Sequence, residues 1–284
     1  MIDLQLHTTD SDGTWTWLRV AEACVSAGLK AFAITDHDTI YRRDEILAWG
    51  KGRDLLAIPG LELSTRENGQ PVHLLGYFFD GPLGPLEEKL VFLRKGRVVR
   101  NGLIIGKLQK LGYNVSEEEV KSLVGQGSFG RPHIAQLLVQ KGIVHSLREA
   151  FGRFLSSRGA AYVPKEEVPL REGIDLLHGA GAVAVVAHPG LLKRTPGELE
   201  TSFDEWRGWG LDGIEAIYPG YSNEQRIFFQ RMASKFDFLM TGGSDFHGDN
   251  KPSIRIGVGS GDLHVPDHLI TPLLDRRDQI LKAV

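Results

Sequence analysis

The chain has 284 residues, enough to bury a full hydrophobic core as one large domain or as one domain with an insert. Apolar residues make up 42% and charged residues 24%, which is ordinary for a soluble globular protein. The net charge of −3 excludes the basic field that drives binding to long nucleic acid, and no stretch is apolar for long enough to span a membrane.

The first part of the chain alternates predicted strands and helices. IDLQL is a predicted strand, and the helix WLRVAEACVSAGL follows it, with Thr14 or Thr16 as its cap and an end near Gly28. AFAIT is the second strand, followed by a helical stretch through Leu47 and by the strands LLAIP and HLLGYFF. This alternation predicts a largely parallel sheet with helices outside it.

Two further features of this part indicate the compartment. Asp3 stands where a secretory signal would be basic and then apolar. The single cysteine, Cys24, lies in an apolar helical run, so no disulfide can form within the chain. We therefore expect a buried, inert thiol and a cytoplasmic protein.

A helical insert interrupts the alternation. From Leu86 to about Ser157 only helical patterns occur, in LEEKLVFLRKGRVVRNGLIIGKLQKLG, SEEEVKSLVG, RPHIAQLLVQKG and SLREAFGRFLSS. Ser116 and Glu119 have the spacing of a capping box. We therefore predict a first barrel segment at 1–82, a helical insert at 83–165, and a second barrel segment at 166–284.

Alternation resumes with AVAVVAHPG, GIEAIYP, FDFLMTGGSDFHG and IGVG, which brings the predicted strands to seven or eight. Each strand is followed by a loop rich in His, Asp or Gly. In barrel folds the chemistry collects where such loops converge, at the carboxyl ends of the strands.

Histidines and carboxylates stand at these strand edges. Packing does not explain the set, because burying several carboxylates together is costly without a compensating cation. Imidazole and carboxylate ligands suit zinc, iron or manganese, and the absence of thiolates argues against a structural zinc site. The candidate metal ligands and catalytic residues are His7, Asp12, His37, Glu62, His73, His188, Asp245 and His247.

The spacing of these residues indicates more than one ion. Gln5 and His7 are two residues apart, as are Asp245 and His247, so each pair can face one side of a strand end. Glu62 can bridge two ions through its two oxygens. One ion cannot use eight ligands and stay open for catalysis, so two or three ions fit the count.

Six ordered motifs carry a family resemblance: DLQLHTTDSDG, TDHD, GLELS, HLLGY, AHPG and GGSDFHG. In this order they resemble the PHP (polymerase and histidinol phosphatase) superfamily, most closely its small bacterial phosphoesterase branch, over essentially the whole chain. The resemblance implies an α/β fold, a distorted (β/α)7 barrel with a helical insertion subdomain, and a cluster of divalent manganese, iron or zinc ions.

The resemblance also implies how the ligands divide. One ion would take His7, Glu62 and Asp245, with Gln5 where the family usually has His. A second would take Glu62, His73 and His188. A third would take Asp12, His37 and His247. Gln5 either ligates weakly through its amide oxygen or hydrogen-bonds a metal-bound water; in both cases we expect the first of these ions to be the loosest.

Several other side chains are candidate substrate contacts. In GRPH, Pro132 at a helix start sets Arg131 and His133 beside free N–H groups that suit a phosphate, although Arg131 could equally be a surface arginine. The resemblance favours the phosphate role for both. Arg158 and Lys165, where the insert returns to the barrel, are candidate contacts for a second phosphate.

These observations predict a metal-dependent phosphoesterase, in which the ions lower the pKa of a water and stabilise the phosphoryl oxygens. The resemblance implies nucleoside 3′,5′-bisphosphates or the 5′ ends of short oligonucleotides as small phosphorylated substrates, with no membrane or long nucleic acid as partner. Two alternatives stay open: hydrolysis of another bond class, as in amidohydrolases, and a non-catalytic module stabilised by metal.

Overall fold

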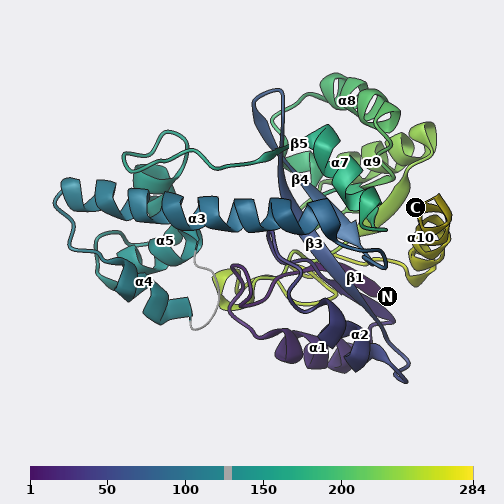
Figure 1. Ribbon diagram of the computed structural model, residues 1–284, viewed down its shortest axis with the longest axis horizontal. Helices are drawn as coiled ribbons and strands as arrows, with labels where there is room; N and C mark the ends of the chain where they lie inside the picture. Colours follow the sequence, from purple (N-terminus) through teal and green to yellow (C-terminus); the bar gives the residue numbers. More distant parts are fainter. Residues whose placement is uncertain (125–129, 284) are drawn as a thin grey trace.

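The computed structural model describes residues 1–124 and 130–283 and has a mixed α/β fold built on one barrel-like sheet (Figure 1). The sheet has eight strands, in the order β1-β2-β3-β4-β6-β7-β8 with β5 beside β3. Their bounds are β1 Ile2–Leu6, β2 Ala31–Ile34, β3 Leu56–Glu67, β4 Gln70–Tyr77, β5 Val168–Pro169, β6 Val183–Val186, β7 Gly213–Ile217 and β8 Leu239–Gly242. A bridge between Leu6 and Phe246 brings the two outer strands together, so the sheet is nearly closed, as the family resemblance implied.

One strand of the barrel runs against the others. β3 and β4 form an antiparallel hairpin, and β4 is also antiparallel to β6, whereas the other neighbouring strands are parallel. The hairpin turns at Asn68 and Gly69, both with positive φ. The beginning of β4 therefore lies at the same edge as the carboxyl ends of the parallel strands.

Two predicted strand boundaries need correction. β3 does not end at Pro59 but continues to Glu67, because its second half pairs with β4 and stays largely buried, so Glu62 lies within the strand. The predicted strand IGVG, residues 256–259, is wrong: it forms a turn closed by a bridge between Arg255 and Gly259, with Gly257 and Gly259 at positive φ. Short apolar runs with glycines at such φ values favour turns over strands.

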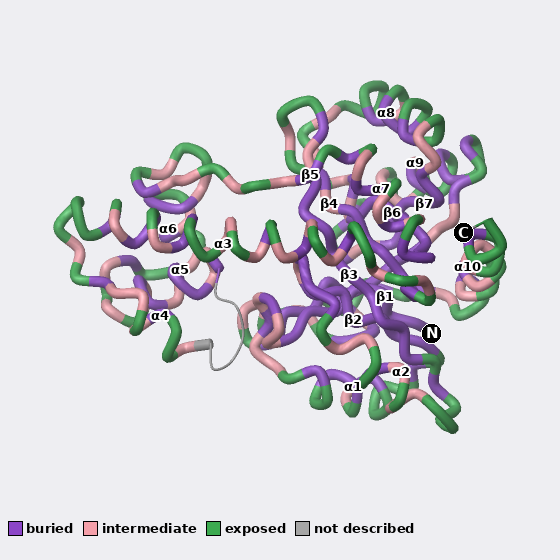
Figure 2. Tube along the Cα trace, viewed as in Figure 1, coloured by how far each residue is buried: buried purple, intermediate pink, exposed green. Residues whose placement is uncertain are grey.

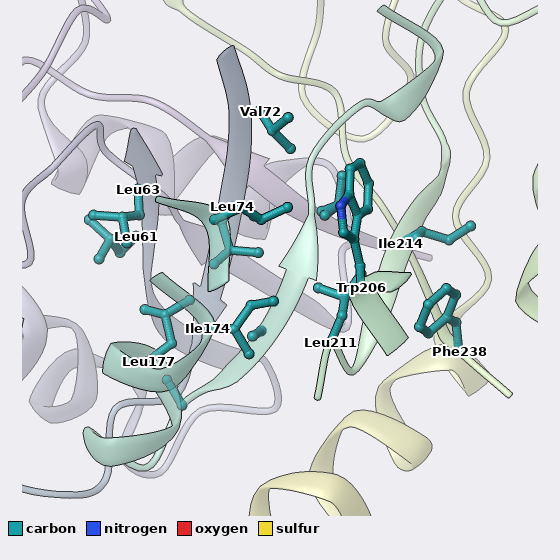
Figure 3. Close-up of a cluster of buried hydrophobic side chains, with 14 of the residues drawn as sticks. Leu61, Leu63, Val72, Leu74, Ile174, Leu177, Trp206, Leu211, Ile214 and Phe238 are labelled. Atoms are coloured by element: carbon teal, nitrogen blue, oxygen red, sulfur yellow. The ribbon is translucent and has the colours of Figure 1, made fainter. Parts of the chain in front are cut away.

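Helices cover the outside of the barrel: α1 Trp17–Ser26, α2 Arg43–Gly50, α7 Leu170–Gly179, α8 Pro196–Gly208, α9 Asn223–Phe236 and α10 Ile270–Ala283. Short 3-10 turns occupy Pro189–Leu191, Gly248–Asn250 and Asp267–Leu269. The Thr16 side chain caps α1 by accepting from the Arg19 amide. Figure 3 shows one part of the core, the buried cluster to which Leu61 and Leu74 of the hairpin and Leu177 of α7 belong.

A second group of helices forms a lobe beside the barrel: α3 Gly84–Lys110, α4 Glu117–Val124, α5 Arg131–Gln140, α6 Leu147–Ala150 and a π-helix at Phe151–Leu155. Each of the four predicted helical segments contains a helix; Gly125, the last residue of SEEEVKSLVG, lies outside the described residues. Ser116 and Glu119 form the capping-box contacts in both directions. Figure 1 shows α3 running from the barrel into this lobe.

The lobe has a hydrophobic core of its own. Leu86 and Leu90, in the first half of α3, pack in the barrel core, whereas Ile104 and Leu108, in its second half, pack with α5 and with Phe154. Burial is continuous along the barrel strands and patchier in the lobe (Figure 2). α3 is therefore the element that couples two cores, while the boundaries at 82/83 and 165/166 stay a prediction.

The expected burial of Cys24 is confirmed, and burial raises the pKa of its thiol, which makes it a poor nucleophile. Within residues 1–124 and 130–283, no helix has both the length and the apolar character needed to cross a membrane.

The aromatic cluster on α8 and α9 gives a test of the core. Phe203 is fully buried, and its ring lies 5.7 Å from that of Trp206 and 6.0 Å from that of Phe238, between centroids. Phe203→Ala should lower the free energy of unfolding by about 3–5 kcal/mol, because it leaves a cavity. Phe92→Ala, at a position 54% exposed, is the control and should change it by less than about 0.5 kcal/mol. If urea denaturation showed equal losses of unfolding free energy for the two variants, this packing would be contradicted.

Candidate metal centre

All eight sequence-predicted ligands lie at one end of the barrel. Seven of them form three overlapping groups whose ligand atoms lie within 4.8 Å of one another: His7, Asp12, His37 and His247; His37, Glu62 and His73; His7, Glu62 and Asp245. The eighth, His188, has its Nε2 3.1 Å from Glu62 Oε1. The grouping differs in detail from the expected division, because His7 and His37 each belong to two groups.

Glu62 is the centre of the arrangement. It is 1% exposed and lies in the middle of β3. Its Oε1 is 2.5 Å from His73 Nδ1, and its Oε2 is 2.9 Å from His7 Nε2. His73 reaches this point because β4 runs antiparallel and begins at this edge. The Glu62 carboxylate therefore receives side chains from opposite sides of the barrel.

Asp12 holds a second set of histidines together. Its Oδ1 lies 3.3 Å from His247 Nε2, and its Oδ2 lies 3.8 Å from His37 Nε2. The rings of His7 and His247 stack with centroids 4.1 Å apart. Strand ends β1, β2 and β8 thus meet at one carboxylate.

The buried charges are strongly coupled to the imidazoles. Burial alone would raise the pKa of Glu62, but His37 and His73 outweigh it and hold that pKa well below its usual range. Burial lowers the pKa of His37 to about 3, despite the nearby carboxylates. A neutral imidazole facing an ionised carboxylate is the state in which both can bind a cation.

Unsatisfied polar atoms support the same interpretation. Both ring nitrogens of His7, the Nδ1 of His37 and the Oε1 of Gln5 are buried without a hydrogen-bond partner among the residues that the structure describes. Buried polar atoms are normally paired, because an unpaired one costs about 1–3 kcal/mol. Imidazole nitrogens with free lone pairs beside carboxylates fit a divalent cation.

The backbone is strained where it delivers ligands. His188 has φ +30° and Asp245 has φ +53°, in the left-handed region that non-glycine residues rarely adopt. Two residues before Asp245, a Cβ added to Gly243 would lie only 2.5 Å from the backbone nitrogen of Gln5. Only glycine lets the loop after β8 approach β1 this closely, which brings Asp245 to His7.

Asp245 has donors that the sequence did not reveal. The Lys251 ammonium lies 2.5 Å from Asp245 Oδ2, and the Tyr218 hydroxyl donates to the same oxygen at 2.7 Å. Beside them, Gln5 Nε2 donates to Glu62 Oε2 at 3.2 Å. Lys251 lies in a loop without regular spacing to the ligands, so no local pattern could have identified it.

Three further aspartates hold the loops that carry ligands. Asp36 accepts from the backbone and hydroxyl of Thr8, and Asp38 accepts from the backbone and hydroxyl of Ser64. Asp3, at the base of β1, accepts from the Ser244 and Gly257 amides, both at 2.8 Å. These carboxylates orient the loops beside the cluster, and neither Asp36 nor Asp38 caps α2.

A cavity of about 600 Å³ opens beside His73 and His188 and extends to the lobe. Two of the four predicted substrate contacts, Arg131 and Lys165, line it. The other two do not: His133 is buried and accepts from the Gly130 amide through Nδ1, and Arg158 is exposed elsewhere.

Arg100 also lines this cavity, and sequence reasoning missed it. Its Nε donates to the Val163 carbonyl at 2.9 Å, while its Nη2 is buried and has no hydrogen-bond partner within residues 1–124 and 130–283. Burial, and then the neighbouring charge of Arg131, lower the pKa of Arg100 to about 10, so the guanidinium stays charged at neutral pH. In the sequence Arg100 is one of several basic residues on a long helix, which gave no signal of its position.

Comparison with known proteins adds three similarities. A 5′-3′ exoribonuclease of Haemophilus influenzae is 33% identical over 248 residues, covering 86% of this chain and 89% of the relative. A 3′,5′-nucleoside bisphosphate phosphatase of Chromobacterium violaceum is 26% identical, covering 90% of each chain. A solved structure from Bifidobacterium adolescentis, classed as a metal-dependent phosphoesterase, has a TM-score of 0.85 at 30% identity, covering 97% of this chain and 96% of the other. No family model matches the chain.

Asp3 gives a test of the electrostatics beneath the cluster. Burial raises its pKa to about 6 despite its hydrogen bonds, so the folded protein keeps this proton up to about pH 6 while the unfolded chain loses it near 3.9. Asp3 therefore stabilises the folded protein below about pH 4. As the pH rises from about 4 to about 6, this contribution to the free energy of unfolding falls by roughly 1.4 kcal/mol per pH unit.

Asp3→Asn should remove this slope, whatever constant cost the amide adds. The measurement is the urea unfolding free energy of wild type minus variant, in chelator, at several pH values between 4 and 7. Asp54→Asn, at an exposed position, is the control with a flat difference. A flat difference for Asp3→Asn would contradict a raised pKa.

Proposed function

The chain belongs to the PHP superfamily of metal-dependent phosphoesterases, and on that premise we propose that it hydrolyses the phosphate of nucleoside 3′,5′-bisphosphates or of the 5′ ends of short oligonucleotides. The named relatives, an exoribonuclease and a bisphosphate phosphatase, support this substrate class. Both names describe the hydrolysis of a phosphoester bond, in a ribonucleotide chain or in a nucleoside bisphosphate.

One observation carries the proposal. The cavity of about 600 Å³ is lined both by imidazoles of the metal centre, His73 and His188, and by the cations Arg100, Arg131 and Lys165. Its volume lies within the range of small-ligand sites. A molecule with one phosphate at the imidazoles and another at the guanidinium groups matches this distribution of charge.

The eight ligands His7, Asp12, His37, Glu62, His73, His188, Asp245 and His247 would hold two or three divalent ions of manganese, iron or zinc. Such ions supply hydroxide near neutral pH and neutralise charge on the reacting phosphoryl group. No side-chain nucleophile is then required. The protein's contribution is to keep His37 neutral by burial and to keep Glu62 ionised, with its pKa held well below the usual range.

The lobe would recognise the non-reacting part of the substrate. Arg131 is anchored through the Leu155 carbonyl, and Arg100 through the Val163 carbonyl. A guanidinium that is anchored on one edge keeps N–H groups for a phosphate, and Nη2 of Arg100 is such a group. Phe151 and Tyr162 line the same cavity and offer ring faces for a base. Lys165, which contacts Ser64, would complete the phosphate site from the barrel side.

Activity should depend on bound metal. Exhaustive chelation should abolish phosphatase turnover, and added manganese should restore it. His247→Ala should reduce kcat/KM by more than about 100-fold, because residues that merely support ligands cost 10- to 100-fold. His178→Ala, whose ring pairs with Asp212 away from the cluster, is the matched control and should be nearly silent. Turnover that survives chelation would rule out this function.

Arg131 should discriminate between substrates. Arg131→Ala should reduce kcat/KM for a nucleoside 3′,5′-bisphosphate by roughly 10- to 100-fold, because a charge-assisted hydrogen bond contributes about 1.5–3 kcal/mol. An aryl phosphate, which has no second phosphate, should be hydrolysed almost as before. Arg148→Ala, exposed on α6, controls for loss of charge in the lobe. Equal losses on both substrates would show that Arg131 does not read the second phosphate.

A further inference from the structure

We infer that the Lys251 ammonium, in place of a third metal ion, supplies the positive charge at the corner formed by His7, Glu62 and Asp245. The protein would then hold two divalent ions, at the groups centred on Asp12 and on Glu62 with His73. The inference rests on the proposed metal centre and concerns one corner of it.

The first observation is the bonding of Asp245. The Lys251 Nζ lies 2.5 Å from Asp245 Oδ2 and 3.4 Å from the backbone carbonyl of the same residue. The Tyr218 hydroxyl donates to that Oδ2 at 2.7 Å. One carboxylate oxygen therefore has two donors, one of them fully charged. Only Oδ1 remains, 3.4 Å from His7 Nε2.

The second observation is Gln5. Its side chain is fully buried, and its Nε2 donates to Glu62 Oε2, the oxygen that also faces His7 at 2.9 Å. The opposite orientation of the amide would set two oxygens against each other. A neutral donor thus occupies part of the corner, and it adds no negative charge to attract a cation.

The third observation is the contrast with the other carboxylates. In the part of the chain that the structure describes, Asp12 and Glu62 form ion pairs with histidines alone. A histidine can bind a cation together with the carboxylate that it faces, whereas an ammonium cannot, so Asp12 and Glu62 remain available to metal ions. Asp245 has its counter-charge already.

Counting charges leads to the same conclusion. The three carboxylates contribute −3, two divalent ions would contribute +4, and Lys251 contributes +1, which sums to +2. That excess suits a phosphate dianion. A third ion would add two more positive charges at the one corner that already holds an ammonium, where like charges repel strongly.

The test is the number of metal ions per chain. The protein is loaded with Mn²⁺, freed of unbound ion by gel filtration, and analysed by elemental mass spectrometry. Wild type should hold two. Lys251→Met should hold a third, bound at least about tenfold more tightly than any third ion in wild type, because a neighbouring positive charge is removed. Adding Gln5→His to Lys251→Met should tighten it further.

Two variants separate charge from other effects. Lys251→Arg keeps the charge and should stay at two ions. Lys235→Met removes a surface lysine that pairs with Glu200 far from the cluster, and should also stay at two. The Lys251 side chain is 39% exposed, so its replacement leaves core packing intact.

Wild type holding three ions as tightly as Lys251→Met would overturn the inference, and so would two ions in both Lys251→Met and the double variant. The measurement does not depend on turnover. An inactive protein with two ions would therefore reject the proposed function alone, whereas an active wild type with three ions would reject only the role of Lys251.

Discussion

The buried carboxylate of Glu62 is the constraint on which the rest of the site depends. Removing an ionised carboxylate from water costs several kcal/mol unless other groups compensate it. Here the compensation comes from His7 after β1, His73 on β4 and His188 after β6. Strands distant in sequence must therefore converge on β3, and the nearly closed sheet is the arrangement that lets them do so. The metal centre therefore depends on the same nearly closed sheet that defines the barrel.

Local patterns predicted much of this arrangement. Apolar runs of strand length and capping signals such as Ser116 with Glu119 depend on neighbouring residues, and they located the helices of the lobe and most barrel strands. The eight candidate ligands could be found because histidine and carboxylate at strand ends is an uncommon combination. Their meeting at one end of the barrel then followed from the fold.

The remaining features depend on contacts between distant segments. The reversed direction of β4 follows from its pairing with β3 and β6, and periodicity along a strand carries no information about direction. Residues 256–259 are apolar but lie in a turn, because Gly257 and Gly259 have positive φ values that are incompatible with a regular strand. Lys251 and Arg100 acquire their surroundings from loops and helices far away in sequence. Their residue type alone predicted solvated surface charges.

The seam between β1 and β8 has a consequence for how the protein is made. A chain emerges from the ribosome N-terminus first and its folding units form in that order. His7, Asp12, His37, Glu62 and His73 are all made early, but Asp245 and His247, and the Leu6–Phe246 bridge that closes the seam, come from near the other end. A nascent chain therefore displays an incomplete cluster until Asp245 and His247 have been made. Complete coordination of an ion at the group of Asp12 therefore has to wait until His247 has been made, whereas His37, Glu62 and His73 are available earlier.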